Sequence, residues 1–280
     1  MNAVQQLNQD VPAAYLGVWQ RRLLTTTQGV HDTTTEVFWL QTARLHADLR
    51  LPVPETTEIT HDPLSSLAEA TPAQQTALAS QAGFAGVTRV HNDGQHDICQ
   101  WHRRIDYQPS SDRADIGTMA FASSERVLED GLDGGYHEVW ERLPDSIGSN
   151  WGVWLGAAEQ PERQGCLLVA GAYFLFAAAR SIVQPVGGRL ADHLRSADAQ
   201  SLLAFELSFG TITDGWTITH STLPGRAGQR LHTAEVDARQ VLPATVIAGL
   251  GAYAPVGGWH LTSDPHLPLL QPVSDAEDTP

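Results

Sequence analysis

The segment Ile98–Tyr107 reads ICQWHRRIDY and alternates between two kinds of side chain. Its odd positions are apolar or aromatic except for Arg103, and its even positions after Ile98 are polar. Period-two alternation is typical of a β-strand that has one sheltered face. The tripeptide Asn92-Asp93-Gly94 separates this segment from the apolar run Phe84–His91. We therefore predict a β-hairpin here.

The same alternation recurs along the chain and predicts a mainly β protein with antiparallel strands. It is found in Tyr15–Leu24, Val37–Leu51, Tyr136–Leu143 and Leu202–Thr213, and Asp214-Gly215 marks a second hairpin. The longest apolar stretch, Cys166–Ala179, is too short to span a membrane as a helix and predicts a buried strand. A helix is expected over 72–82, because Thr71 and Gln74 form a capping box around Pro72 and Gly83 suits its C-terminal end.

The chain length of 280 residues favours two domains over one. The short polar segment Pro144–Asn150 is the best boundary, so we predict one barrel over 1–147 and a second over 148–270. Residues 271–280 are acidic, lack aromatic side chains and predict a disordered tail.

The bulk composition narrows the possible partners. A net charge of −15 opposes binding to nucleic acid and to anionic membranes. The N-terminus carries no secretory signal and the two cysteines imply no disulfide framework, so a cytoplasmic location is expected. The apolar stretch 166–179 would need a cover at a sheet edge, and a homodimer is one way to provide it.

Gly17-Val18-Trp19, followed by antiparallel strands, resembles the Gly-x-Trp signature of lipocalins and other calycins. Short blocks at 38–42, 47–52, 136–141 and 167–176 resemble fungal casein-kinase-interacting proteins built from two lipocalin-like barrels, and their bacterial relatives. This resemblance implies two consecutive barrels and a protein partner. It transfers no catalytic residue. Tyr173 departs from the pattern, which has a Trp there.

In a barrel the strand positions alternate between interior and exterior, so each strand can be divided into two faces. The aromatic faces all contain a polar or charged group, and a buried charge must pair, stack or contact a ligand. The candidate catalytic residues are Glu138 as acid or base, with Arg103 and Arg21 stabilising negative charge. The candidate substrate-binding residues are Trp39, Gln41, Trp101, Tyr107 and Trp140.

Structural interpretations compete with each of these assignments. Arg103 or Arg142 stacked on Trp19 would close one end of a barrel, and Glu138 could be a counter-ion of Arg103. In His91–Asp97 a tight turn explains the Asn, Asp and Gly better than a metal site does. His220 is either a core histidine or a group that transfers a proton. No metal or cofactor motif is found in the sequence.

The sequence therefore favours a barrel that binds a small apolar or amphipathic molecule and has the groups for cofactor-independent acid–base chemistry, as in a lyase, isomerase or hydrolase. Two alternatives stay open. One is a ligand carrier without turnover, and the other is a protein-interaction module whose barrels are filled by side chains.

Overall fold

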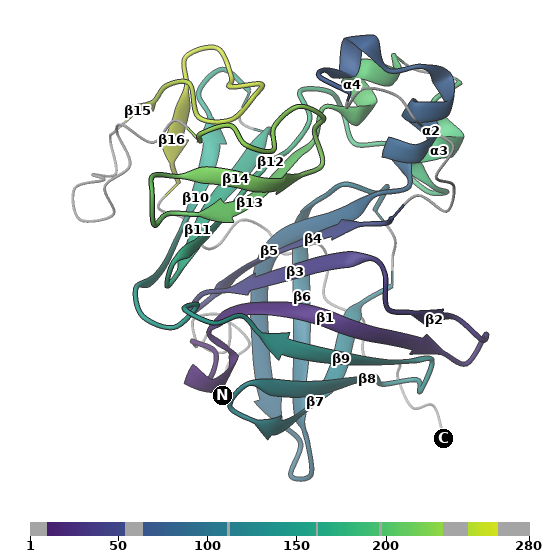
Figure 1. The fold of residues 1–280 in the computed structure, drawn as a ribbon, viewed down its shortest axis with the longest axis vertical. Coiled ribbons are helices and arrows are strands. Elements are labelled where there is room, and N and C mark those ends of the chain that lie inside the picture. The colour runs from purple at the N-terminus through teal and green to yellow at the C-terminus, as the bar shows by residue number, and fades with distance from the viewer. Residues whose placement is uncertain are drawn as a thin grey trace, which may run out of the picture.

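The computed structural model describes residues 10–53, 64–110, 113–160, 162–195, 198–231 and 246–262, and shows a mainly β protein (Figure 1). The predicted fold class is therefore confirmed. The predicted acidic tail, 271–280, lies outside the described residues. No helix in the described ranges is long and apolar enough to cross a membrane.

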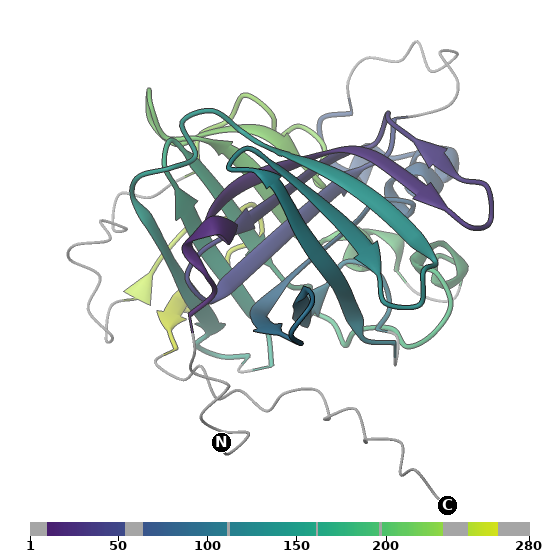
Figure 2. The same cartoon turned by 90° about the horizontal axis from the view of Figure 1, so that it is seen from below.

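The first half is a closed antiparallel barrel of eight strands (Figure 2). Successive strands pair with one another, and the last pairs back with the first, with Trp19 opposite Arg142. A two-residue strand, β2 (His31–Asp32), extends the sheet beside β1. The barrel strands are β1 (Gly17–Thr26), β3 (Glu36–Gln41), β4 (Leu45–Leu51), β5 (Ala82–Asn92), β6 (Asp97–Asp106), β7 (Asp115–Ser123), β8 (Arg126–Gly131) and β9 (Tyr136–Arg142).

One end of the barrel is closed by an arginine that lies on a tryptophan. The Arg142 guanidinium lies 4.3 Å from the Trp19 ring centroid. It also donates to two backbone carbonyls. One is that of Ala14 in the 3-10 helix η1 (Ala13–Tyr15), and the other is that of Leu16, the residue after this helix. Gly17 has φ +125°, and a Cβ there would lie 3.3 Å from Arg142 Nη1. The arrangement predicted for Arg142 and Trp19 is confirmed, and it explains the glycine of the Gly-x-Trp signature.

The second half forms an antiparallel sheet of seven strands in the order β14-β13-β12-β11-β10-β16-β15. No pairing between β14 and β15 closes it within the described ranges, so the predicted second barrel is an open sheet there. Its strands are β10 (Asn150–Ala157), β11 (Gln164–Ala170), β12 (Tyr173–Ala178), β13 (Glu206–Thr211), β14 (Thr217–Ser221), β15 (Val246–Ile247) and β16 (Trp259–Leu261).

The stretch Cys166–Ala179 contains two strands where a single strand was expected. The chain reverses at Gly171, which has φ +58° and whose added Cβ would come within 2.0 Å of the Asp145 carbonyl oxygen. β11 and β12 then pair as a hairpin, with Ala170 opposite Tyr173. Both predicted hairpins, at Asn92-Asp93-Gly94 and at Asp214-Gly215, are confirmed.

The α-helices are short and gather at one corner of the molecule (Figure 1). The capping box of Thr71 and Gln74 is present, but helix α2 (Pro72–Ala79) ends three residues earlier than predicted. Gly83 belongs to β5, where it lies opposite Leu49, and the close approach of Asp48 O and Leu207 leaves no room there for a Cβ. The others are η2 (Leu67–Glu69), α3 (Leu190–His193) and α4 (Ala199–Leu203).

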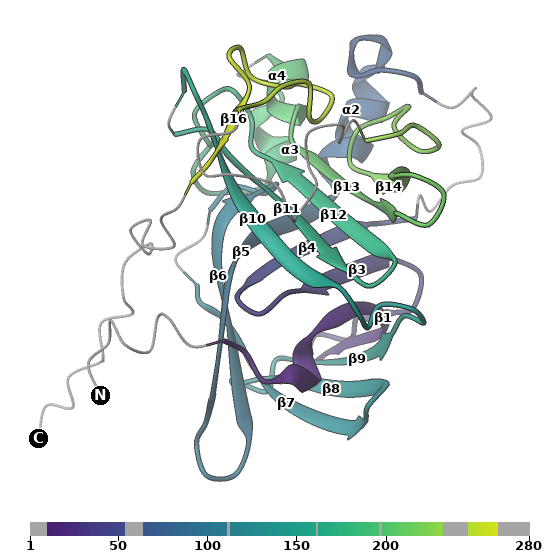
Figure 3. The ribbon, with the colours of Figure 1, turned by 90° about the vertical axis from the view of Figure 1, so that its left-hand side faces the viewer.

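The second sheet packs against the outer wall of the barrel at β3 and β4 (Figure 3). Outward-facing residues of the barrel and one face of β11–β13 form one apolar core. The Phe38 and Phe209 rings stack in it with centroids 4.4 Å apart. The Asn150 side chain adds a hydrogen bond to Gln41 O. The hydrophobic core therefore crosses the domain boundary predicted at 147, and that boundary stays a prediction.

We expect Phe38→Ala to reduce the free energy of unfolding by about 3–5 kcal/mol, because it opens a cavity in this shared core. Tryptophans in both halves should report a single urea transition, since Trp39 lies in the barrel and Trp259 in the second sheet. Val183→Ala is the control, because Val183 is exposed and should change stability by less than about 0.5 kcal/mol. Two separate transitions in the wild type would contradict a shared core.

Candidate functional site

The barrel interior is built around four buried tryptophans: Trp19, Trp39, Trp101 and Trp140. The Trp39 ring makes edge contacts with both Trp101 and Trp140, with centroids 5.6 and 5.8 Å away. The Trp19 ring stacks on Trp39 with centroids 6.3 Å apart, so all four tryptophans form one aromatic group, supplied by strands β1, β3, β6 and β9. The sequence prediction that Trp39, Trp101 and Trp140 share a sheltered face agrees with this placement.

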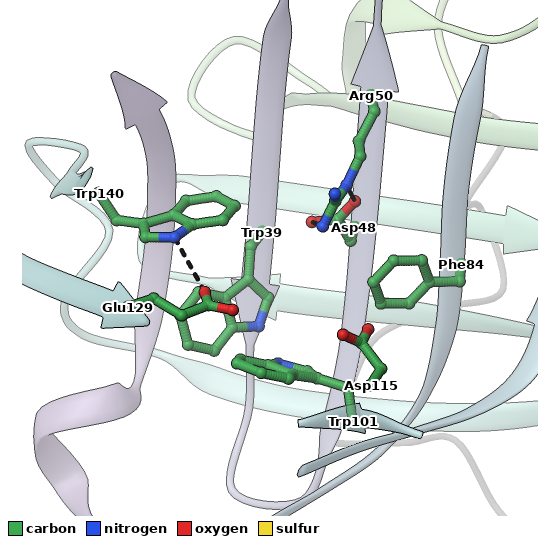
Figure 4. A pocket seen from close by; sticks show the side chains of 8 residues that line it. All are labelled: Trp39, Asp48, Arg50, Phe84, Trp101, Asp115, Glu129 and Trp140. Atoms are coloured by element: carbon green, nitrogen blue, oxygen red, sulfur yellow. Dashed lines mark hydrogen bonds and ion pairs between the residues drawn. The ribbon is translucent and has the colours of Figure 1, made fainter. Parts of the chain in front are cut away.

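A small cavity lies beside these rings (Figure 4). Its volume is about 10 Å³, which is room for about one water molecule. Polar and aromatic side chains alternate around it. The lining residues are Trp39, Asp48, Arg50, Phe84, Trp101, Asp115, Glu129 and Trp140.

Glu129 is the most unusual of the lining residues. Its side chain accepts hydrogen bonds from the Tyr136 hydroxyl at 2.7 Å and from Trp140 Nε1 at 3.1 Å. No arginine, lysine or histidine of the described ranges forms an ion pair with it. Burial, and then the charge of Glu138, raise the pKa of this carboxyl well above its usual range. Glu129 is therefore suited to hold a proton at pH values where exposed glutamates have lost it.

Glu138, the acid or base predicted from the sequence, is buried in an ion pair. Arg21 Nη1 lies 2.9 Å from Glu138 Oε1, and Arg21 Nη2 lies 2.7 Å from Asp32 Oδ2. Burial raises the pKa of Glu138, while the charges of Arg50 and Arg21 act against that shift. Arg21 thus neutralises Glu138, in place of the Arg103 that was considered as its counter-ion.

Arg103 and Arg50 are more exposed than Arg21, with 37% and 27% of their side chains exposed. The Arg103 guanidinium lies 3.6 Å from the Phe84 ring centroid and pairs with Asp106 and Asp115. Arg50 Nε lies 2.6 Å from Asp48 Oδ1. Arg50 lines the cavity, and Arg103 contacts Phe84 and Asp115 of its lining.

Carboxylates outnumber guanidinium groups in the cavity lining and in the ion pairs next to it. Arg21, Arg50 and Arg103 face six acidic side chains: Asp32, Asp48, Asp106, Asp115, Glu129 and Glu138. Two of the arginines each serve two carboxylates, and Glu129 has none. Full ionisation would leave an excess of negative charge inside a sheltered space, which is electrostatically costly.

Gln41 holds Trp39 in place and lies outside the cavity lining. Its Oε1 accepts from Trp39 Nε1 and from Thr88 Oγ1, and its Nε2 donates to Thr42 O and Leu45 O. Every polar atom of this buried amide is therefore engaged within the protein. Gln41 therefore positions the Trp39 indole ring. Its geometry suits this role better than the predicted contact with substrate.

Tyr107 was expected in the pocket and lies outside it. A β-bulge places Ala85 opposite Ile105 but Gly86 opposite Arg103, which exchanges the two faces of β6 at this point. Tyr107 consequently joins the core between the barrel and the second sheet and donates to Leu78 O. Strict alternation could not predict this exchange.

The structure favours structural roles for His220 and for the histidines of the hairpin at 91–97. His220 packs on Phe38 and Phe209, 3.5 Å from a Glu36 oxygen and away from the cavity lining. In the hairpin at 91–97, Asp93 Oδ1 accepts from the backbone N–H groups of Gln95 and His96, as the turn interpretation predicted. The described residues hold no group of three His, Cys, Asp or Glu side chains that could bind a metal.

Four charged residues of the cavity were missed in the sequence: Asp48, Arg50, Asp115 and Glu129. Asp48 lies opposite Trp39, so the inward face of β4 consists of even positions, whereas strict alternation from Trp39 through 51 predicts odd ones. The turn at 42–44 shifts the inward positions from odd in β3 to even in β4. The geometry of this turn is the feature that would have indicated the shift. Glu129 lies in the short strand β8, which has little apolar alternation to mark it.

No protein-family model and no curated protein matches the chain. Among solved structures, the uncharacterized protein YLR301w from Saccharomyces cerevisiae is similar, with a TM-score of 0.54 and 11% identity over 88% of this chain and 97% of that chain. At this identity the likeness shows the fold alone. It supports the barrel, and the relation to lipocalin-like, casein-kinase-interacting proteins stays a prediction.

The raised pKa of Glu129 makes the stability of the protein depend on pH in a defined direction. Between the ordinary glutamate pKa of 4.5 and the raised native value, the folded protein keeps a proton that the unfolded chain releases. Rising pH therefore favours unfolding in this window. Glu129→Gln removes the titration, so urea unfolding from pH 4.5 upward should show the variant gaining stability relative to wild type as pH rises.

Glu141→Gln is the matched control, because Glu141 lies on β9 with 41% of its side chain exposed. Its free energy of unfolding relative to wild type should stay nearly constant over the same range. A constant difference for Glu129→Gln as well would show that Glu129 titrates normally.

Proposed function

We propose that the barrel of the first half binds a small amphipathic molecule in the aromatic cavity, and that the polar end of this molecule is an ammonium or another N–H donor. The observation that carries the proposal is the Glu129 carboxyl, buried among tryptophans without a cationic partner in the described ranges. A buried carboxyl of this kind is stabilised by a proton or by a cationic ligand.

The charge balance favours a cation over an anion. Six carboxylates surround three guanidinium groups, so a positive ligand reduces the local imbalance and a carboxylate ligand increases it. The cavity walls agree with this choice, because the faces of Trp39, Trp101 and Trp140 can attract an organic cation. The apolar body of the ligand would pack on the same rings.

The ligand needs more room than the present cavity of about 10 Å³. Arg50 and Arg103 can supply it, because both have long flexible side chains that are partly exposed. When the Arg50 guanidinium swings outward, it leaves Asp48 without its partner. The ammonium of the ligand then pairs with Asp48 in place of the guanidinium and also supplies the positive charge that Glu129, on the same cavity wall, lacks.

A proton-transfer role belongs to Glu129 in this proposal, where Glu138 was the sequence candidate. Glu129 lines the cavity and burial raises its pKa, whereas Glu138 is paired with Arg21. If the bound molecule is transformed, the chemistry is a cofactor-independent lyase, isomerase or hydrolase step with Glu129 as the acid. Arg103, next to the cavity lining, would then stabilise negative charge that develops on the substrate.

The protein-interaction module is the second candidate, and the small cavity is the observation that favours it. A barrel filled by its own side chains has no need of a ligand. Recruitment of a protein partner would then depend on the acidic surface, in line with the resemblance to casein-kinase-interacting proteins. The homodimer and the cytoplasmic location remain parts of the proposal in either case.

Binding is tested with pairs of molecules that share an apolar body and differ in charge, such as 2-phenylethylamine and 3-phenylpropionate. The amine should raise the thermal stability, by about 2.7 kcal/mol at 100 times its Kd, and should change tryptophan fluorescence. The acid should do neither. Trp101→Leu should weaken amine binding roughly 10-fold through the lost ring, while Glu141→Gln should leave it unchanged.

A panel of arylalkylamines without effect would overturn the binding proposal and favour the interaction module. For any amine that is converted, Glu129→Gln should abolish turnover and Glu138→Gln should spare it in part. Unchanged turnover in Glu129→Gln would exclude that carboxyl as the acid.

A further inference from the structure

A second pocket lies in the other half of the protein, away from the barrel interior. Its volume is about 300 Å³, which is at the lower end of the range for metabolite sites. Its walls are mostly polar and come from the residue before β11, the segment after β12, helix α4 and the loop before β16. The lining residues are Arg163, Ser181, Asp198, Gln200, Ser201, Ala204, Tyr253 and Ala254.

Arg163 is a buried cation without a carboxylate partner. Only 6% of the residue is exposed, and no ion pair within the described ranges includes it. Glu206, the acidic group that acts on it electrostatically, is engaged by Arg226 at 3.0 Å, by Ser208 and by the Ala252 N–H. Burial lowers the pKa of Arg163, as expected for a charge that is insufficiently compensated.

The Arg163 guanidinium lies 5.4 Å from the Trp259 ring centroid, and its hydrogen bonds engage only two of its three nitrogen atoms. Nε donates to Ala179 O and Nη2 donates to Tyr253 O, while Nη1 has no acceptor among the described residues. Arg180 shows what a purely structural arginine looks like in this protein. Its Nε, Nη1 and Nη2 all donate to backbone or amide oxygens. Arg163 differs because it lines a cavity and because the N–H groups of its Nη1 have no acceptor among the described residues.

We infer that this pocket binds a small carboxylate, whose oxygen accepts from Arg163 Nη1. A carboxylate supplies the missing negative charge and the missing acceptor together. The neutral groups around it, Ser181, Gln200 and Tyr253, provide hydrogen bonds for further polar atoms of the ligand. Asp198 caps α4 through the N–H groups of Gln200 and Ser201. Its negative charge on the same wall disfavours multiply charged anions.

The test uses glycolate as the probe and glycolamide as its uncharged counterpart, at constant ionic strength. Isothermal titration calorimetry should show binding of glycolate and none of glycolamide. Arg163→Met should weaken binding roughly 10- to 100-fold through the lost charged hydrogen bond. Arg195→Met, which removes an exposed positive charge from the same half, should bind as wild type does.

Two further variants keep the inference testable if Arg163→Met does not fold. Ser181→Trp fills the pocket from an exposed position and should abolish binding with the Arg163 contacts intact. Asp198→Asn keeps a helix cap and should tighten binding about two- to fivefold by removing a repulsive charge. The inference is overturned if the wild-type protein binds none of glycolate, acetate and benzoate. It is also overturned if the Ser181→Trp variant binds glycolate as well as the wild type does.

Discussion

The pairing of β1 with β9 is the constraint on which the rest of the structure depends. It joins the first strand of the barrel to the last and removes both sheet edges. It also encloses every inward-facing charge, so each of them needs a partner. Arg21 shows this directly, since it extends from β1 to Glu138 on β9 and to Asp32 on β2. The charge pattern of the interior is thus a consequence of closure.

Closure makes the outer wall of the barrel available as a packing surface. Phe38 on β3 alternates with inward-facing Val37 and Trp39, and its ring stacks on Phe209 of the second sheet. Arg180 adds a polar connection, because it donates to the Asp106 and Tyr107 carbonyls while lying near the Tyr107 ring. Burial lowers its pKa to about 10, still well above neutral pH, so it remains a cation there. The two halves are therefore held by apolar area and by a buried arginine.

The two halves solve the problem of buried charge in different ways. In the barrel, carboxylates exceed arginines and the surplus falls on Glu129, whose pKa is raised by burial. In the second half, Arg163 is a buried group without a counter-charge in the described ranges, and it lines the cavity of about 300 Å³. The barrel lacks a positive charge and the second half lacks a negative one, so the two cavities suit ligands of opposite charge. One chain could thus hold a cationic group in one half and a carboxylate in the other.

The sequence by itself determined the β class, the two hairpins, the capping box of α2 and the enclosure of Arg21, Trp39, Trp101 and Glu138. These features depend on local alternation and turn chemistry, which a linear pattern contains. Only the tertiary structure decided that Tyr107 faces outward, that Asp48 and Arg50 face inward, and that Glu129 lacks a counter-ion. A bulge and a tight turn exchange the faces of a strand, and ion pairing between distant strands depends on barrel closure. Neither leaves a periodic trace in the sequence.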